Sequence, residues 1–420
     1  MDRNFVATRV AFETLGCKLN QAESESLARD LEAAGFCLVA PDESCDVYVL
    51  NACTVTATAD AKARQLLRLA HRRRANSVLV AAGCYGESVA GALRAVTGTQ
   101  VLLCRDKAEV VPKLRQLGYG GRCVRNHTRR RTRAFVKAQD GCSSFCTYCI
   151  VPFIRGREKS RPPDDVVNEV SARVGESYQE VVLTGTEIGA YRHQGLDLAG
   201  LLGRILKETG VARLRLSSLQ PTEITPALLK FWGDHRLCPH FHMSLQSGSD
   251  SVLRRMGRHY NAAEYLAAAG RIRDAVPDAA ITTDIIVGFP GETEAEFEES
   301  YCLCASLGFA RIHVFSFSPR PGTAAAAMPA QVATGIKKER SQRMLVLAKE
   351  SAKAYRSLFL GRTLAVLWET EASGILTGYT GNYIRIFADA GQGLPNTILA
   401  VRLIKLYKDG VWGEIQKEVI

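Results

Sequence analysis

The stretch Gly141-Cys142-Ser143-Ser144-Phe145-Cys146-Thr147-Tyr148-Cys149 decides the central part of this chain. Its three cysteines, Cys142, Cys146 and Cys149 (the loop triad below), follow the spacing C-x3-C-x2-C directly after an apolar, strand-like segment. Three thiolates at this spacing can hold three irons of a cubane iron–sulfur cluster and leave the fourth iron open. An open metal position indicates chemistry, whereas structural zinc sites are closed by four ligands. Structural zinc and buried free thiols remain the alternatives for this loop.

The loop triad lies near the start of a region, residues 128–358, in which strand-like and helix-like segments alternate. We predict six strands there, separated by helices: residues 135–138, 180–183, 213–217, 241–245, 281–287 and 312–317. Consecutive βα units without hairpin signals form parallel sheets, and six of them indicate an incomplete relative of the (βα) barrel. Residues 331–360 are rich in Ala, Lys, Arg, Leu and Glu, which predicts one long helix.

The regions on either side differ from this core. Residues 7–119 alternate strands and helices, which predicts a second parallel α/β sheet domain. Its expected elements are residues 10–14, 21–34, 47–50, 57–74, 78–82, 87–96 and 101–104. Residues 118–127 are typical of a linker. Residues 361–420 carry short alternating stretches broken by glycines, which predicts a small all-β barrel with strands at 363–368, 383–386 and 398–403.

Composition limits the class of protein. The chain has 420 residues, 46% of them hydrophobic, and a net charge of +11, which fits a globular protein of two or three domains. No apolar run reaches the roughly 18 residues of a membrane span, and residues 1–10 lack a secretion-signal pattern. We therefore expect a cytoplasmic protein without a membrane partner. Thirteen cysteines in such a chain favour metal binding or redox chemistry over a disulfide framework.

A second set of three cysteines is dispersed along the N-terminal region. Cys17, Cys53 and Cys84 (the rim triad below) each lie just beyond the end of a predicted strand. Because the carboxyl ends of parallel strands meet at one rim of a sheet, these cysteines can converge. The residues alone leave two interpretations equally open, a second metal site or small buried hydrophobic side chains. The remaining cysteines are expected to be packing residues: Cys37, Cys45, Cys104, Cys123, Cys238, Cys302 and Cys304.

The C-x3-C-x-aromatic-C pattern, with Tyr148 in the aromatic position, resembles the radical S-adenosylmethionine (SAM) superfamily. The resemblance implies that the open iron binds SAM and that reductive cleavage gives a 5′-deoxyadenosyl radical. Thr184-Gly185-Thr186-Glu187 is similar to the superfamily's contact with the methionyl amine, and residues 284–292 are similar to the stretch near the adenine. The cofactor contacts that this implies, several of them at strand ends, are Tyr148, Thr184, Gly185, Glu187, Ser217, Gln246 and Gly288.

The whole chain resembles the methylthiotransferase family of that superfamily. Residues 14–23, 51–54 and 82–84 are similar to the family's N-terminal domain, residues 245–249 and 318–323 to its radical core, and residues 361–420 to TRAM domains. The resemblance implies two [4Fe-4S] clusters, the second held by the rim triad and carrying or donating sulfur. It further implies SAM as both radical source and methyl donor, and a reduced electron donor such as flavodoxin or ferredoxin. The overall reaction replaces a C–H hydrogen with SCH3.

The sequence around Cys17, Leu-Gly-Cys-Lys-Leu-Asn-Gln, is most similar to the MtaB branch of the family. That similarity implies conversion of N6-threonylcarbamoyladenosine to its 2-methylthio derivative at the purine 3′ of the anticodon, so the anticodon loop of tRNA is the expected partner. Two other substrates remain alternatives, isopentenyladenosine in tRNA and an aspartate of a ribosomal protein. A non-catalytic iron–sulfur RNA-binding protein is the alternative from a different class.

Charge independently favours an RNA partner. Residues 125–161 hold ten Lys or Arg and two Asp or Glu, a local net charge of 10 − 2 = +8 that would attract phosphate, unless the run is simply a solvated basic loop. The cations flanking the loop triad are Arg129, Arg130, Arg131, Arg133, Arg155, Arg157, Lys159 and Arg161. The C-terminal module, with six Lys or Arg and six Asp or Glu, is net neutral. Its rings either stack on RNA beside Arg385 or fill its core: Tyr379, Tyr383 and Phe387. Three further arginines either bind a carboxylate or form a solvated helix face: Arg254, Arg255 and Arg258.

Overall fold

The computed structural model describes residues 7–52, 57–73, 76–83, 101–104, 106–123 and 131–416. By its internal contacts the chain divides into two compact units. Unit 1 comprises Met1–Arg130, Cys149–Gly156 and Ser318–Gly322, and unit 2 comprises Arg131–Tyr148, Arg157–Phe317 and Thr323–Ile420. Each unit is described by itself below.

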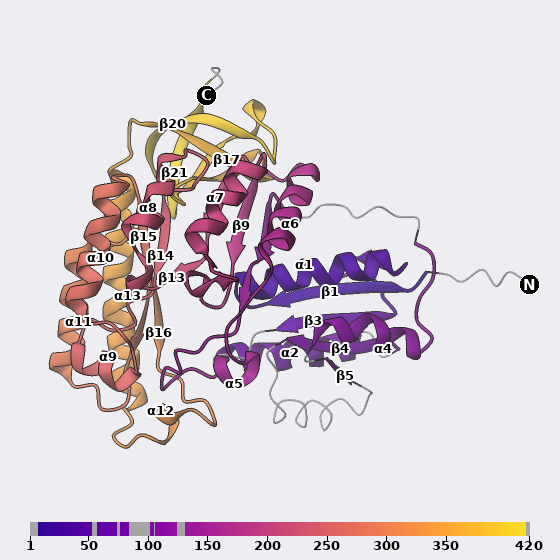
Figure 1. Ribbon diagram of the computed structural model, residues 1–420, viewed down its shortest axis with the longest axis horizontal. Helices are drawn as coiled ribbons and strands as arrows, with labels where there is room; N and C mark the ends of the chain where they lie inside the picture. The colour runs from indigo at the N-terminus through magenta and orange to yellow at the C-terminus, as the bar shows by residue number, and fades with distance from the viewer. Residues whose placement is uncertain are drawn as a thin grey trace, which may run out of the picture. The chain divides into compact units, whose positions relative to one another are not determined.

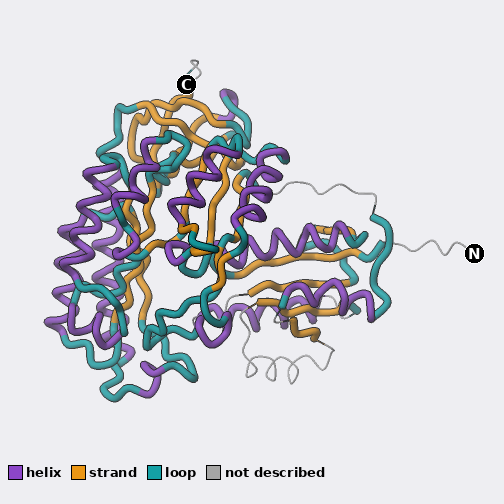
Figure 2. Tube along the Cα trace, viewed as in Figure 1, coloured by secondary structure: helices purple, strands orange, loops and turns teal. Residues whose placement is uncertain are grey.

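Unit 1 contains the predicted parallel sheet. Five parallel strands lie in the order β2-β1-β3-β4-β5, with helices packed against them (Figures 1 and 2). All six residues of β3 are buried, so both faces of the sheet are covered, as parallel sheets require. The elements are β1 (Arg9–Leu15), α1 (Lys18–Ala33), β2 (Cys37–Val39), β3 (Val47–Ala52), α2 (Ala57–Arg73), β4 (Val78–Gly83), β5 (Val101–Cys104), η1 (Lys107–Glu109), α4 (Val110–Gln116) and α5 (Val151–Arg155). The helix expected at residues 87–96 lies outside the described residues.

The strand order of unit 1 defines where a ligand site belongs. The chain runs outward from β1 to β2 and then returns to the other side of β1 for β3, so the topology switches direction between β1 and β3. In open parallel sheets, ligands bind beyond the carboxyl ends of the strands at this switch point. In sequence, the rim triad follows the carboxyl ends of β1, β3 and β4, and these three strand ends lie on the edge that this rule selects.

Two expectations about the cysteines are wrong. Cys37 and Cys123 form a disulfide across 86 residues of sequence instead of packing as free thiols. The backbone brings them together because Cys123 N–H donates to Gly35 O at 3.1 Å, next to the start of β2. Cys302 is exposed on the solvent face of its helix. The packing interpretation is confirmed for three buried cysteines, Cys104, Cys238 and Cys304, while Cys45 is half-buried.

Unit 2 contains the predicted partial barrel. Seven parallel strands follow one another in sequence order, as the sheets β6-β9-β12 and β13-β14-β15-β16, and Leu214 of β12 forms a bridge with Leu237, just before β14. The strand expected at 213–217 is interrupted at Ser217 and continues as a second short strand. The Ser217 hydroxyl accepts a hydrogen bond from the Gly185 amide, in the loop after the neighbouring strand β9. The strands are β6 (Arg133–Lys137), β7 (Gln139–Asp140), β8 (Lys159–Ser160), β9 (Glu180–Thr184), β10 (Arg192–His193), β11 (Leu196–Asp197), β12 (Arg213–Leu216), β13 (Ser218–Leu219), β14 (His240–Met243), β15 (Ala280–Val287) and β16 (Arg311–Ser316).

Helices cover the outer face of this barrel (Figure 1). Alternate strand residues such as Phe241, Met243 and Ile281 face the helices and share one buried core with Tyr265 and Met344. The long helix predicted at 331–360 is confirmed as α13 (Thr334–Ser357). The remaining helices are α6 (Pro163–Gly175), η2 (Ile188–Ala190), α7 (Leu198–Glu208), η3 (Pro221–Glu223), α8 (Pro226–Leu229), η4 (Lys230–Gly233), α9 (Asp250–Met256), α10 (Ala262–Ala275), α11 (Glu294–Leu307) and α12 (Ala324–Ala327).

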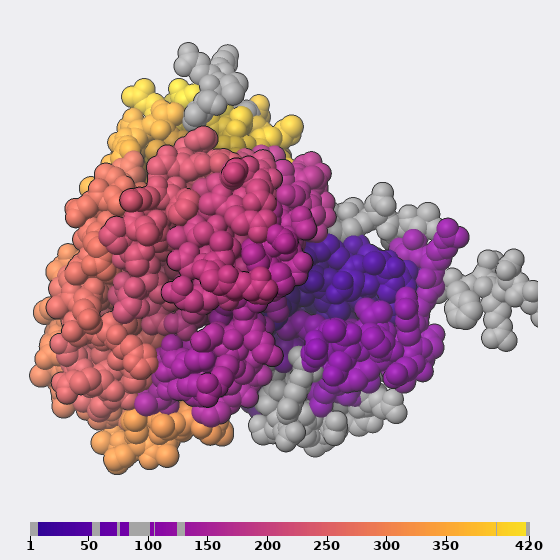
Figure 3. Space-filling view, in the orientation of Figure 1, coloured from indigo at the N-terminus to yellow at the C-terminus, as the bar shows by residue number. Residues whose placement is uncertain are grey.

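The C-terminal module is a closed five-stranded barrel in the order β17-β18-β19-β21-β20. Its elements are β17 (Thr363–Ala372), β18 (Ile375–Thr380), β19 (Arg385–Asp389), η5 (Ala390–Gln392), β20 (Ile398–Tyr407) and β21 (Gly410–Ile415). The module, yellow in Figure 3, sits directly on the rest of unit 2. Across the described residues, no helix combines the length and hydropathy needed to span a bilayer. The mixed α/β fold with a small terminal barrel is therefore as predicted.

Candidate active site

Cys142 lies in the loop that follows the first barrel strand. Gly141 before it has φ 73°, which glycine adopts without strain. Cys142 Sγ lies 2.9 Å from a carboxylate oxygen of Glu187, and the Ser144 amide donates to the same sulfur at 3.4 Å. The Gln220 amide nitrogen donates to the Glu187 carboxylate. Burial and the Glu187 contact raise the pKa of the Cys142 thiol to about 12. Iron binds thiolate, so ligation would displace this proton.

Cys146 is buried against a cation. The Arg258 guanidinium donates to Cys146 Sγ at 3.3 Å, to Gln220 Oε1 at 3.1 Å and to Tyr260 Oη at 3.0 Å. A cationic N–H donor stabilises negative charge on the sulfur. Arg258 is therefore not part of a solvated helix face. The third member of the loop triad, Cys149, is half-buried and lies in the Cys149–Gly156 segment of unit 1.

Tyr148 is held by an apolar cluster in the described part of unit 2. Its partly buried ring packs against Val252, Met256, Phe289, Phe317 and Ala325. The neighbouring Thr147 donates its amide to Met256 O at 2.9 Å and accepts from the Ala325 amide at 2.8 Å. The cysteine loop is thus fixed to α9 and α12 by both backbone and side-chain contacts.

The carboxyl ends of β9 and β12 bring together the residues predicted to meet the methionyl amine. The Glu187 amide donates to Gln139 Oε1 at 2.9 Å, and the Gly185 amide donates to Ser217 Oγ at 3.3 Å. A Cβ on Gly185 would lie 2.7 Å from Gln139 Oε1, so a larger residue does not fit. Thr184 is 1% exposed, and its hydroxyl has no hydrogen-bond partner among the described residues. A bound ligand would satisfy this buried polar group.

Gln246 and Gly288 follow the ends of β14 and β15. Gln246 has φ 67°, a conformation that is uncommon for a residue with a side chain and that clusters at functional sites. The backbone amide of Gln246 donates to Asp284 O at 2.8 Å, and its backbone carbonyl accepts from the Ile286 amide at 2.9 Å. Gly288 has φ 72°, and a Cβ there would lie 2.4 Å from Cγ of Lys337. Both backbones are therefore held in conformations that their surroundings impose.

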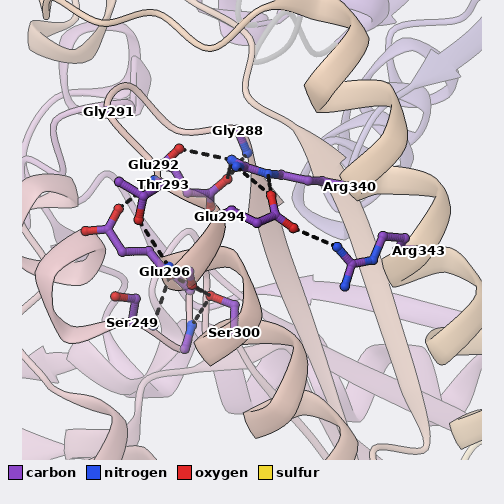
Figure 4. A network of polar contacts seen from close by, with 12 residues as sticks. Ser249, Gly288, Gly291, Glu292, Thr293, Glu294, Glu296, Ser300, Arg340 and Arg343 are labelled. Carbon is purple, nitrogen blue, oxygen red and sulfur yellow. Dashed lines mark hydrogen bonds and ion pairs between the residues drawn. The ribbon is translucent and has the colours of Figure 1, made fainter.

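Helix α13 braces the loop after β15 (Figure 4). Glu292 accepts from the Gly288 amide at 2.6 Å and from Arg340 at 2.8 Å. Arg340 also meets Glu294 at 3.0 Å, and Arg343 meets the other oxygen of Glu294 at 2.8 Å. Burial raises the pKa of Glu292, although Arg340 and the Gly288 amide oppose that effect. The predicted adenine contact is consequently a rigid loop.

In unit 1 the strand ends that precede the rim triad are aligned. Leu15 pairs with Ala52, and Ala52 pairs with Gly83, so the three carboxyl ends lie side by side. Cys17 is exposed at the start of α1, and its thiol donates to Asn20 Oδ1 at 3.2 Å. The other two members lie outside the described residues: Cys53 and Cys84.

A buried asparagine pair fixes this rim. Asn51 donates to Asn20 O and to Ser24 Oγ, both at 2.8 Å, and Asn20 donates back to Asn51 Oδ1 at 3.3 Å. Gly83 has φ 110°, and a Cβ there would lie 2.6 Å from Asn51 Oδ1. The position just before Cys84 in sequence therefore requires glycine.

Comparisons with known proteins match both units. The family described as the Radical SAM superfamily matches residues 136–304, and the family described as Uncharacterized protein family UPF0004 matches residues 9–104. A Bacillus subtilis protein named "Threonylcarbamoyladenosine tRNA methylthiotransferase MtaB" is 33% identical over 98% of both chains. A Thermotoga maritima protein of the same name is 37% identical over 90% of both. The chain belongs to the methylthiotransferase family of the radical SAM superfamily.

Solved structures support the same fold. This methylthiotransferase superposes on the radical SAM methyltransferase TsrM from Kitasatospora setae with a TM-score of 0.58 at 13% identity, covering 76% of this chain and 77% of TsrM. A Pelotomaculum thermopropionicum protein named "tRNA-2-methylthio-N(6)-dimethylallyladenosine synthase" is 34% identical over 93% of this chain and 95% of its own. The family includes named enzymes for two tRNA nucleosides, which makes the substrate a separate question.

The cofactors of this family are SAM and two [4Fe-4S] clusters, and the residues of this methylthiotransferase fit them. The mouth of the barrel is the end at which the carboxyl ends of its strands lie. Groups that suit the cofactors gather there: the buried Cys146 sulfur beside Arg258, the Cys142 sulfur beside Glu187, and the Thr184 hydroxyl, which has no hydrogen-bond partner among the described residues. On the rim, the aligned strand ends precede all three cysteines in sequence. Sequence reasoning found no signal for Gln139 and Gln220, and it suggested Arg258 only as a carboxylate-binding or solvated residue, whereas Arg258 contacts Cys146.

Three of the cations expected to attract RNA are engaged by carboxylates. The pairs are Arg133–Glu369 at 2.6 Å, Arg155–Glu23 at 2.9 Å and Arg161–Glu169 at 2.6 Å. Their charges are therefore largely neutralised within the protein. Three others are exposed: Arg131, Arg157 and Lys159. The remaining two, Arg129 and Arg130, lie outside the described residues. Of the other arginines, Arg254 is exposed and Arg255 pairs with Glu296 at 2.9 Å.

The aromatic residues of the C-terminal module are used internally. Arg133 lies over the rings of Tyr379 and Tyr383, each 5.2 Å from its centroid, and Arg215 lies 4.5 Å from that of Tyr383. Phe387 is buried. Phe387 therefore fills the interior of the module, as one of the two interpretations expected. Tyr379 and Tyr383 instead attach the module to the barrel floor, the end of the central barrel where β6, β9 and β12 begin.

Proposed function

We propose that this enzyme converts N6-threonylcarbamoyladenosine in tRNA to its 2-methylthio derivative, at the purine 3′ of the anticodon. The observation that carries the proposal is the match to relatives named for this reaction over nearly the whole chain, at 33–37% identity. Because that match covers both the cysteine-bearing rim and the radical barrel, it is not a likeness of one shared domain. Isopentenyladenosine and a ribosomal-protein aspartate are the competing substrates.

The loop triad would hold the first cluster and the rim triad the second. When bound, the clusters and SAM would supply radical chemistry at C2 of the base, together with the sulfur and the methyl group that replace the hydrogen there. The chain's own contribution is placement. Gln139 fixes the Glu187 backbone, Ser217 fixes Gly185, and Glu292 fixes the Gly288 loop that would meet the adenine ring. Together with Tyr148, Thr184 and Gln246, these residues form the proposed SAM site.

A basic cavity in unit 2 supports an RNA substrate. It has a volume of about 590 Å³ and lies between β16, α13 and the C-terminal barrel. Its cationic lining residues are Arg311, Lys349, Lys353, Arg356, Arg385 and Lys408, against the single acid Asp409. Nε atoms of Arg356 and Arg385 are buried without hydrogen-bond partners in the described chain. Clustered cations of this kind bind phosphodiester backbone.

We expect the reaction to take place in the cytoplasm, because that is where a tRNA substrate and a reduced flavodoxin or ferredoxin as electron donor would meet the enzyme.

The test of the substrate is a nucleoside profile of tRNA from a strain that lacks the gene. We expect the methylthio derivative of threonylcarbamoyladenosine to disappear while that of isopentenyladenosine stays. Loss of the isopentenyl derivative instead would reassign the substrate, and an unchanged profile would exclude tRNA. Complementation with the loop triad changed to alanine should fail to restore the nucleoside.

A further inference from the structure

The inner face of the barrel is polar along three neighbouring strands. His242 on β14, Asp284 on β15 and His313 on β16 alternate with core residues, so their side chains lie on the face opposite the helices. Asp284 of β15 pairs with His313 of β16. His242 of β14 pairs with Thr282, which lies two residues before Asp284 on β15. All three side chains are half-buried, and one ligating atom from each lies within 4.8 Å of the others.

Hydrogen bonds organise these side chains into one row. His242 Nε2 lies 3.2 Å from Asp284 Oδ2, and its Nδ1 lies 2.9 Å from Thr282 Oγ1. The Ser244 hydroxyl donates to the same Asp284 oxygen at 3.3 Å. The His242 and His313 rings meet edge to face, with centroids 5.9 Å apart. Although burial opposes it, the two imidazoles and the Ser244 hydroxyl lower the pKa of Asp284, which keeps its carboxylate ionised as an acceptor.

The row lies next to the proposed cofactor contacts at the carboxyl ends of the barrel strands. The Gln246 backbone amide donates to Asp284 O at 2.8 Å, and Gly288 follows Asp284 by four residues, just beyond the end of β15. His242 pairs with Thr282, two residues before Asp284, so the row runs from the proposed cofactor contacts along the inner face of the barrel. In adenine, C2 and C6 are separated only by N1, so a base whose C2 faces the cofactor contacts directs its N6 substituent sideways, toward the neighbouring barrel wall.

The chemistry of the row matches one of the possible N6 substituents. The urea N–H groups and the hydroxyl of a threonylcarbamoyl group can donate to the Asp284 carboxylate, and its own carboxylate can accept from an imidazole N–H of the row. Arg311, two residues before His313 on the same strand, adds a cation on the side away from the mouth. An isopentenyl group offers only hydrocarbon and would desolvate the row without replacing its hydrogen bonds.

We propose that His242, Asp284 and His313 form the subsite that reads the polar N6 substituent, and so set the preference for threonylcarbamoyladenosine over isopentenyladenosine. This inference rests on the proposed function. Sites built to hydrogen-bond a substrate group reject analogues that lack it by factors on the order of 10⁴. Two imidazoles and a carboxylate also suit a transition-metal ion, and that occupant is an outcome of the test.

The test uses the reconstituted full-length enzyme and two anticodon stem-loops, one with threonylcarbamoyladenosine and one with isopentenyladenosine. For each, kcat/KM is measured from methylthio-nucleoside formation. We expect His313→Leu to lower kcat/KM for the first substrate about 10- to 100-fold, the effect of losing one buried hydrogen bond to a charged group. Its kcat/KM for the second should fall much less, so the ratio between substrates changes. The matched control is His235→Leu, since the His235 side chain is 95% exposed and outside the row.

Three results separate the possible outcomes. Equal losses on both substrates, or an unchanged ratio, would overturn the subsite. If His313→Leu fails to fold, His313→Gln keeps the imidazole's size class and polarity and is expected to retain part of the preference. A metal ion beyond the iron of the clusters, present in the native enzyme and lost in either variant, would assign the row to metal binding and overturn the proposal. A native enzyme inactive on threonylcarbamoyladenosine would instead refute the proposed function.

Discussion

Replacing Glu180 by Gln should destabilise unit 2 strongly, although the side chain is far from any cysteine. Glu180 is 1% exposed on the barrel floor and meets Arg215 at 2.7 Å and Arg213 at 3.1 Å. Burial favours the neutral acid, but the arginines outweigh it and lower the pKa of Glu180 from 4.5 to about 2. That difference corresponds to about 3 kcal/mol of stabilisation at neutral pH, in line with the roughly 3–5 kcal/mol lost when a buried ion pair is broken.

The sign of the pH dependence follows from the lowered pKa. Glu180 contributes its full stabilisation above its ordinary pKa of 4.5, and that contribution is lost as pH falls through about 2. Thermal denaturation of the Glu180→Gln variant should therefore show a melting temperature lower by about 6–12 °C at pH 7 and a flatter decline below pH 4.5. The control is Glu208→Gln, which removes an exposed pair with Arg204 and should change little.

Docking of the C-terminal barrel depends on the same arginines. Arg215 donates to Gly381 O at 2.8 Å, and Arg213 donates to Tyr379 O at 3.2 Å. If the Glu180→Gln substitution loosens these arginines, the rate of tRNA methylthiolation should fall more than the rate of SAM cleavage measured without tRNA. A Glu180→Gln protein with native melting temperature and activity would refute this account of the floor.

Three other perturbations test the site. Changing the loop triad to alanine should reduce iron from about eight to about four per chain and abolish 5′-deoxyadenosine release; retention of all iron in a colorimetric assay would contradict the ligand assignment. Arg258→Met removes a cation 3.3 Å from Cys146 Sγ, so the midpoint potential of the first cluster should become more negative in a redox titration, whereas Arg254→Met, on an exposed position, should leave it unchanged. Changing Lys349 and Lys353 to alanine should weaken tRNA binding and reduce the slope of log affinity against log salt by about 1–2; an unchanged slope would place the tRNA backbone elsewhere.

The sequence predicted the elements whose pattern is local. All six barrel strands were predicted because apolar residues recur along them, and α13 because its composition favours a long helix. Strand β2 was missed because it has three residues at a sheet edge, and β18 and β21 because closure of the barrel, not local composition, defines them. The domain limits at 7–119, 128–358 and 361–420 stay predictions.

Contacts between distant residues were harder to predict. The Cys37–Cys123 bond spans 86 residues, and Arg258 reaches Cys146 across 112 residues, so neither spacing carries a signal. The barrel's inner row was accessible in principle. His240, His242 and Ser244 alternate with apolar residues, which shows that one face of this strand is polar, but only the register with β15 places Asp284 beside them.

The most direct test of the central claim is the reaction itself. The reconstituted enzyme is incubated with SAM, dithionite and tRNA bearing N6-threonylcarbamoyladenosine, and the nucleosides are analysed by mass spectrometry. The account predicts a product in which SCH3 replaces the C2 hydrogen, formed together with 5′-deoxyadenosine and absent when the loop triad is changed to alanine. Release of 5′-deoxyadenosine while this nucleoside stays unmodified, and isopentenyladenosine in a parallel reaction is methylthiolated, would contradict it.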